Sequence, residues 1–262
     1  MRGASIFSVG TVIGVLGGLI GLGGAEFRLP LLITIFHFAP LEAVILNKAM
    51  SLVVVASALP FRAETVPFDA IAAQWGVIAN LLAGSLLGAW LGADCATRLK
   101  SEWFYRIIAG LLLMVAFILI LGHDRAAGVG TPFNGSLQIV AGVLAGFVIG
   151  IVASLLGVAG GELLIPTLML LFGTDIKLAG SLSLMVSLPT MIVGFARYSQ
   201  DQSFGVLRRN LGFVALMAAG SIVGSFIGGQ LLSIVPTSIL LPLLAMILVI
   251  SALKLATHEK AA

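Results

Sequence analysis

The chain has 262 residues, of which 60% are hydrophobic and only 10% are charged. A soluble domain of this size cannot hide so much apolar surface, and the mean hydropathy of +1.17 agrees. The composition therefore excludes a soluble globular protein and predicts an all-α polytopic membrane protein. The net charge of +3 does not indicate nucleic-acid binding, and the single Cys95 excludes an internal disulfide.

Apolar runs recur along the whole chain, so the first run is expected to be a membrane segment rather than a removable signal peptide. They predict helices at about 5–22, 26–38, 41–61, 69–94 and 103–122, then at 137–158, 162–173, 177–196, 206–232 and 236–256. The second segment of each half spans about 18 Å, against a hydrocarbon core of about 30 Å. Each is therefore predicted to be one arm of a re-entrant or broken-helix hairpin.

A glycine-rich stretch that ends in Glu and then Pro occurs twice, at residues 21–30 and 157–166, an offset of 136 residues. The same offset pairs many other positions without a gap. The chain is therefore predicted to be a tandem duplication, with a first membrane repeat at 1–136 and a second at 137–262.

Equivalent links of the two repeats differ in positive charge. The link at 94–106 carries Arg98, Lys100 and Arg106, whereas its equivalent at 231–242 carries no cation. The preceding link shows the reverse, with Arg62 in the first repeat against Arg197, Arg208 and Arg209 in the second. The positive-inside rule then predicts inverted repeats, with the links at 94–106 and 197–209 and both termini in the cytoplasm. A parallel duplication of four plain helices per half is the alternative.

The two glycine-rich stretches are candidate transport sites. Inverted-repeat transporters bind substrate near the midplane, where interrupted helices point free N–H groups at an anion. Close backbone approach is expected at Gly23, Gly24, Gly160 and Gly161, next to Ala25. A tight turn that serves only helix packing is the competing interpretation.

A glutamate follows the glycines in both copies, as Glu26 and Glu162. An acidic side chain in the first turn of a helix is stabilised by the helix dipole, so both are candidate caps. Carboxylates inside a membrane are nevertheless expensive and usually functional. A charged carboxylate repels an anion whereas a protonated one does not, which leads to the hypothesis that one of the two carries a coupled proton.

Two cations break the symmetry of the repeats, because Arg28 and Lys48 align with Leu164 and Leu184. They either neutralise the glutamates or bind one anionic substrate.

Polar side chains on the following helices are candidate donors to the same anion. They are Asn47, Ser51, Ser183 and Ser187. The competing interpretation is that the serines bond their own backbone.

Two glycine ridges are predicted to pack two long helices against each other across the pseudo-twofold axis. They consist of Gly84, Gly88 and Gly92, and of Gly220, Gly224 and Gly228. Cys/His clusters, nucleophile elbows and phosphate loops are not found in the sequence, so we expect no enzyme activity, metal or cofactor.

The doubled glycine-rich motif resembles that of the TauE/SafE family of membrane transporters. Its pattern is G-x-G-G-G-x4-P-x-L, from which the chain departs at Ala25 and Ala159. The resemblance implies export of small sulfur-containing anions, such as sulfite or sulfoacetate, across a bacterial inner membrane.

The combined prediction is a secondary transporter with two inverted repeats that exports a small anion, coupled to protons. Its expected partners are the anion and the lipid bilayer, not nucleic acid. The alternatives are a passive anion channel of the same architecture and a membrane subunit that only assists another protein. The sequence does not indicate the oligomeric state.

Overall fold

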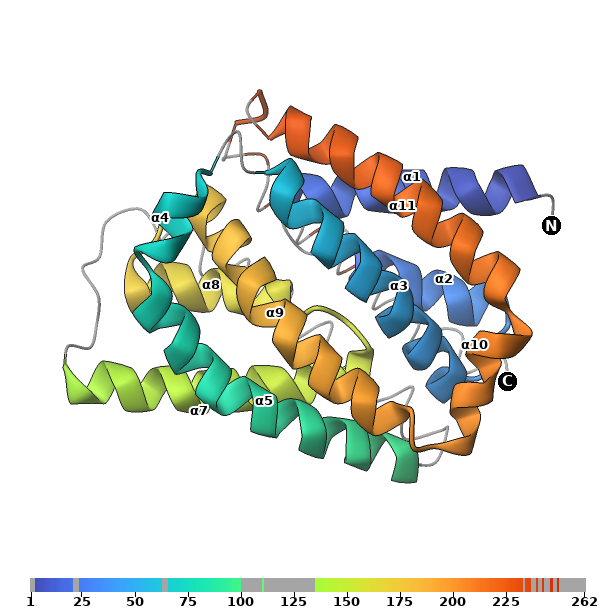
Figure 1. Ribbon diagram of the computed structural model, residues 1–262, viewed down its shortest axis with the longest axis horizontal. Coiled ribbons are helices and arrows are strands. Elements are labelled where there is room, and N and C mark those ends of the chain that lie inside the picture. Colours follow the sequence, from blue (N-terminus) through green and yellow to red (C-terminus); the bar gives the residue numbers. More distant parts are fainter. Residues whose placement is uncertain are drawn as a thin grey trace.

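The computed structural model describes residues 3–20, 24–62, 66–99, 110 and 135–232, together with single positions between 234 and 249. Within these residues the protein is helical and has no strands (Figure 1). The first half of the chain, called the first repeat here because of the 136-residue offset in the sequence, contributes α1 (Gly3–Ile20), α2 (Ala25–Thr34), α3 (Pro40–Phe61), α4 (Phe68–Ala72) and α5 (Trp75–Arg98). The second contributes α7 (Ser136–Leu156), α8 (Gly161–Phe172), α9 (Ile176–Tyr198), the 3-10 turn η1 (Gln202–Phe204), α10 (Gly205–Arg209) and α11 (Leu211–Leu231).

Five described helices are long and apolar enough to cross a membrane, namely α3, α5, α7, α9 and α11. The protein is therefore a multi-pass membrane protein. The two central helices, α9 and α3, bury 61% and 56% of their most apolar stretch inside the protein, against 39% for α11. Leucine and phenylalanine side chains on the outer helices remain exposed, as expected of a surface that faces lipid.

Most predicted helices agree with the structure to within a few residues, but two are each split in two. The segment predicted at 69–94 is α4 followed by α5, and the segment predicted at 206–232 is α10 followed by α11. At the second break the Asn210 side-chain amide donates to the Val206 carbonyl at 3.0 Å and so competes with the helical backbone. The segments predicted at 103–122 and 236–256 lie outside the described residues, apart from single positions.

The two short helices α2 and α8 begin in the same way. Each follows a glycine in the left-handed region, Gly24 with φ 70° and Gly160 with φ 81°. A glycine adopts this conformation without the Cβ clash that other residues meet, so the chain can turn sharply into the helix. With 10 and 12 residues, α2 and α8 are about 15–18 Å long, too short to cross a bilayer alone.

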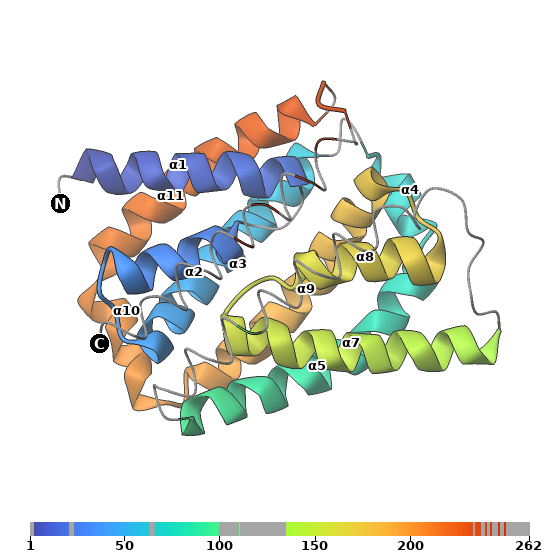
Figure 2. The ribbon, with the colours of Figure 1, turned by 180° about the vertical axis from the view of Figure 1, so that it is seen from behind.

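At each edge of the molecule, a helix of one repeat packs against a helix of the other repeat. In both views α1 lies against α11 and α7 lies against α5, while α3 and α9 run side by side through the centre (Figures 1 and 2). Seen from behind, α2 lies over α3 and α8 lies over α9, while α1 crosses α11 and α7 crosses α5 (Figure 2). Every one of these contacts has a counterpart at the 136-residue offset.

The glycine ridges lie at these edge contacts. A Cβ atom on Gly88 would meet the backbone of α7 at Phe147, and one on Gly224 would meet the backbone of α1 at Thr11. The prediction that the two ridges pack against each other is therefore wrong. Each instead packs against the first helix of the other repeat, whose own glycines complete the contact: Gly10, Gly14 and Gly18 in α1 and Gly142, Gly146 and Gly150 in α7.

Candidate functional site

The Arg28 side chain joins three helices inside the protein. Its Nη1 donates to Ser51 Oγ at 3.0 Å and to Asn47 Oδ1 at 3.4 Å, both on α3. Its Nη2 donates to Ser221 Oγ on α11 at 3.2 Å. Arg28 and its three partners are fully buried. The structure therefore brings together Arg28, Asn47 and Ser51 as the sequence suggested, and adds Ser221, which the sequence did not reveal as a partner.

Polar side chains of the long central helices also hold the glycine-rich stretches. Asn47 Nδ2 donates to the Ala25 carbonyl at 3.0 Å, and Ser187 Oγ donates to the Ala159 carbonyl. Ser183 Oγ donates to the Gly180 carbonyl of its own helix at 2.8 Å. Ser183 and Ser187, the two candidate serines of the second repeat, thus both donate to backbone carbonyls.

Lys48 follows Asn47 on α3 but contacts a different part of the protein. Its Nζ lies 3.2 Å from Ser154 Oγ on α7 and 5.7 Å from the centroid of the Tyr198 ring on α9. The Tyr198 hydroxyl in turn donates to the Ser154 carbonyl at 2.7 Å. All three residues are fully buried. Arg28 and Lys48 therefore occupy two separate polar clusters rather than one.

The two glutamates and the remaining glycines lie at the starts of the short helices. Glu162 is fully buried in the first turn of α8, where the helix dipole stabilises negative charge. Glu26 occupies the equivalent position in α2, but its side chain, like the whole of Gly23, lies outside the described residues. Gly161 is the first residue of α8 and is buried.

Arg62 is a buried polar residue whose contacts sequence reasoning missed. It was counted as a loop charge, yet only 1% of it is exposed, at the end of α3. Its guanidinium donates to four acceptors on two helices: the carbonyls of Gly18 and Leu19 at the end of α1, and Ser181 Oγ and the Lys177 carbonyl near the start of α9. The only signal in the sequence is that Arg62 aligns with Tyr198 and Gly18 with Ser154, and this alignment does not itself indicate burial. Arg62 and Tyr198 thus make equivalent bonds to the end of the first helix of each repeat.

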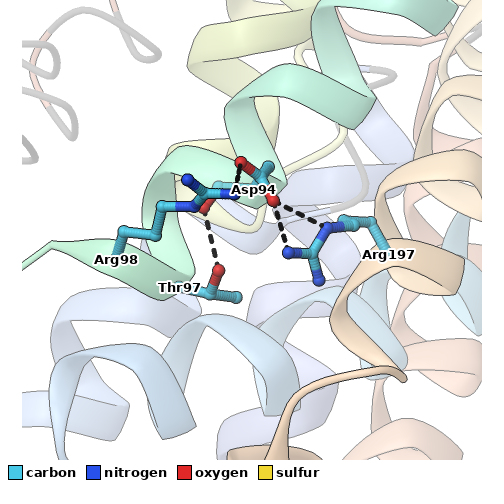
Figure 3. Close-up of polar contacts among 4 residues, drawn as sticks. All are labelled: Asp94, Thr97, Arg98 and Arg197. Carbon is cyan, nitrogen blue, oxygen red and sulfur yellow. Dashed lines mark hydrogen bonds and ion pairs between the residues drawn. The ribbon is translucent and has the colours of Figure 1, made fainter.

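A cluster of charges lies at one end of the molecule, where α5 and α9 finish (Figure 3). Asp94 of α5 forms an ion pair with Arg197 of α9, whose Nε also donates to Asp94 Oδ1 at 3.1 Å. Arg98, one turn further along α5, reaches Asp94 Oδ2 at 2.9 Å. The three side chains are partly to largely exposed, so this pairing ties two helix ends together without burying charge.

An apolar groove lies away from these clusters, between α7 and α8. It has a volume of about 540 Å³ and is lined by Leu144, Val148, Leu163, Pro166 and their neighbours. Its lining contains neither Arg28 nor Lys48. A groove of this composition on a membrane protein suits hydrocarbon rather than an anion.

These features define a multi-pass membrane protein whose helical frame encloses buried cations, which is an arrangement typical of transporters. The chain belongs to the sulfite exporter TauE/SafE family, which it matches over residues 6–255. It is also similar to the probable membrane transporter protein YunE of Bacillus subtilis (strain 168), with 26% identity over 205 residues that cover 71% of this chain and 74% of that protein. No solved structure matches the chain.

Proposed function

We propose that this protein is a secondary transporter that exports a small anion, such as sulfite or sulfoacetate, across a bacterial inner membrane. The observation that carries the proposal is the complete burial of two cations, Arg28 in the first glycine-rich stretch and Lys48 on α3, in a chain from a transporter family. Buried cations inside a membrane protein are costly and mark ion pathways. The family description supplies the class of anion.

The proposed topology is an inverted pair of repeats with both termini in the cytoplasm. Two contacts at opposite ends of α9 support it. Arg62, at the end of α3, bonds the Lys177 carbonyl at the start of α9, whereas Arg197 at the end of α9 pairs with Asp94. The links that follow α3 and α9 are equivalent in the two repeats, and they lie about 30–35 Å apart, which is the length of α9.

The topology is tested by labelling single cysteines placed at Ser101 and Ser203 in a Cys95→Ser background. Both should react only from the cytoplasmic side, because the links that contain them carry the positive bias. Labelling from opposite faces would favour the parallel arrangement.

The proposed anion site lies where the glycine-rich stretches meet the two central helices. Its backbone part comprises Gly23, Gly24, Ala25, Gly160 and Gly161. Its side-chain part comprises Arg28, Asn47, Lys48, Ser51, Ser183 and Ser187. The contacts from Asn47 to Ala25 and from Ser187 to Ala159 support this placement, because they bring the central helices against both stretches.

A screen of purified protein in liposomes tests the function. Sulfite, sulfoacetate, sulfate and thiosulfate would be offered with and without a pH gradient. We expect saturable movement of at least one anion that a proton gradient drives uphill. Saturable flux that no gradient drives uphill would instead favour the passive channel. No movement of any anion would favour the assisting subunit and overturn the proposed function.

A further inference from the structure

The two buried cations differ in what they bond. Arg28 donates to two acceptors on α3 and one on α11, so it links three helices. An ammonium has three donors. Among the residues that the structure describes, the Lys48 ammonium has one hydrogen-bond partner, the neutral Ser154 Oγ, and no carboxylate within ion-pair distance. Lys48 therefore keeps two donors for which the described residues supply no hydrogen-bond acceptor.

A glycine on α9 allows Lys48 and Ser154 to pack closely against that helix. A Cβ atom on Gly194 would lie 2.8 Å from Lys48 Nζ and 2.8 Å from Ser154 Oγ. Any larger residue there would crowd both polar atoms. The equivalent position in the first repeat is Ala58, so the glycine occurs only in the repeat that faces the lysine.

The Tyr198 ring completes the surroundings of the ammonium. Its hydroxyl is fixed by the Ser154 carbonyl, which leaves the ring within the distance at which a cation interacts with an aromatic face. This contact partly stabilises the ammonium but does not neutralise its charge. A buried ammonium with no protein counter-charge is costly unless an anion supplies that charge.

We propose that Lys48, Ser154 and Gly194 form the subsite that binds the transported anion, and that Arg28 instead holds α2, α3 and α11 together. The inference rests on the proposed function. It reduces the cations proposed to bind the anion from two, Arg28 and Lys48, to Lys48 alone. In this subsite the Lys48 ammonium and the Ser154 hydroxyl donate to oxygens of one small oxyanion. Gly194 lets both side chains lie close to α9, and the Tyr198 hydroxyl holds the backbone carbonyl of Ser154.

The test measures binding to the purified full-length chain in detergent. Thermal stabilisation would first identify which of sulfite, sulfoacetate, sulfate and thiosulfate binds the wild-type protein. The dissociation constant of that anion would then be measured for the wild type and each variant. Lys48→Met should raise it about tenfold or more, because a charge-assisted hydrogen bond is lost. Ser154→Ala should raise it about fivefold. Gly194→Ala should also weaken binding, through crowding of the ammonium.

One control accompanies these variants. Leu184→Met changes the repeat equivalent of Lys48 and should leave the dissociation constant unchanged. Arg28→Gln is the test of the second half of the proposal. If Arg28 only holds helices together, this variant should lower thermal stability and change the dissociation constant of the folded fraction less than about threefold.

The outcomes separate the two levels of the proposal. If the wild type binds and moves none of the four anions, the proposed function falls and the subsite with it. If the wild type binds an anion and Lys48→Met binds it equally well, the subsite alone is overturned. If Lys48→Met does not fold, the other two variants decide. Wild-type affinity in both Ser154→Ala and Gly194→Ala would overturn the proposed subsite. An Arg28→Gln variant that folds normally but loses binding would place the anion at Arg28.

Discussion

The two repeats share one helical frame but differ in the charge of their interiors. Equivalent helices make equivalent contacts, down to the left-handed glycines that start α2 and α8. The first repeat, however, supplies three buried cations, Arg28, Lys48 and Arg62, where the second has leucine, leucine and tyrosine. The helical frame is therefore the same in both repeats, while the polar interior differs. Two of the three cations, Arg28 and Arg62, bond neighbouring helices, and Lys48 is the one that we propose binds the anion.

The largest expected effect is on proton-driven transport, and it concerns Glu162. This buried acid is the repeat equivalent of Glu26. If these acids carry the coupled proton, Glu162→Gln should abolish uphill, proton-driven flux while the protein still inserts, because Gln keeps the shape but cannot carry a proton. Liposome flux with and without a pH gradient measures this. Glu26→Gln shows whether one or both repeats contribute. Wild-type uphill flux in both variants would leave the two glutamates as helix caps.

Arg62 and Tyr198 provide the sharpest comparison of stability. Arg62→Met leaves four acceptors without their donor, three of them in buried bonds, and should cost about 3–5 kcal/mol. Tyr198→Phe leaves one carbonyl without its donor and should cost about 1–2 kcal/mol. Thermal unfolding of both purified variants in the same detergent measures the difference. If both variants lose the same amount of stability, the additional hydrogen bonds of Arg62 do not stabilise the protein beyond the single bond of Tyr198.

The glycine ridges should respond alike in the two repeats. Gly88→Ala and Gly224→Ala place a Cβ against the backbone of the neighbouring helix, so each should cost about 1–3 kcal/mol through overpacking. Gly76 and Gly212 are matched controls, since they are repeat equivalents with no atom near their missing Cβ. Their alanine variants should be neutral or slightly stabilising. Tolerance of alanine at Gly88 but not at Gly224 would show that the two edges are packed differently.

The smallest effect is expected where α2 and α8 end. His37 has φ 57°, and its repeat equivalent Gly173 has φ 68°. A left-handed conformation strains histidine but not glycine, so His37→Gly should stabilise the protein by about 0.5–1 kcal/mol. The reverse change, Gly173→His, should destabilise it by a similar amount. A small fall in melting temperature for His37→Gly would contradict this explanation.

The repeated motif made the helical frame and the starts of the short helices predictable. Gly24 and Gly160 could be found because duplication presents the same turn twice. The sequence could not reveal that each glycine ridge packs against the first helix of the other repeat. Small residues allow two helices to approach closely, but they do not determine which helix is the neighbour.

The polar clusters were predictable only in part. Lys48 and Ser154 are 106 residues apart, and no local pattern links them. Arg62 resembled a loop charge, because an arginine at the end of an apolar helix usually reaches the interface. Only the fold shows that it is buried and bonds two other helices. The contacts that pattern reasoning missed therefore join residues that lie far apart in the sequence, on different helices.

Counterflow in liposomes tests most directly whether the protein transports its anion by alternating access. Vesicles that contain the purified chain would be loaded with unlabelled sulfite, or with whichever anion the wild type binds, and placed in a trace of the labelled anion. A transporter should accumulate label above its external concentration, because internal anion returns the loaded site to the outside. Label that only equilibrates would indicate a passive channel and contradict the proposed mechanism.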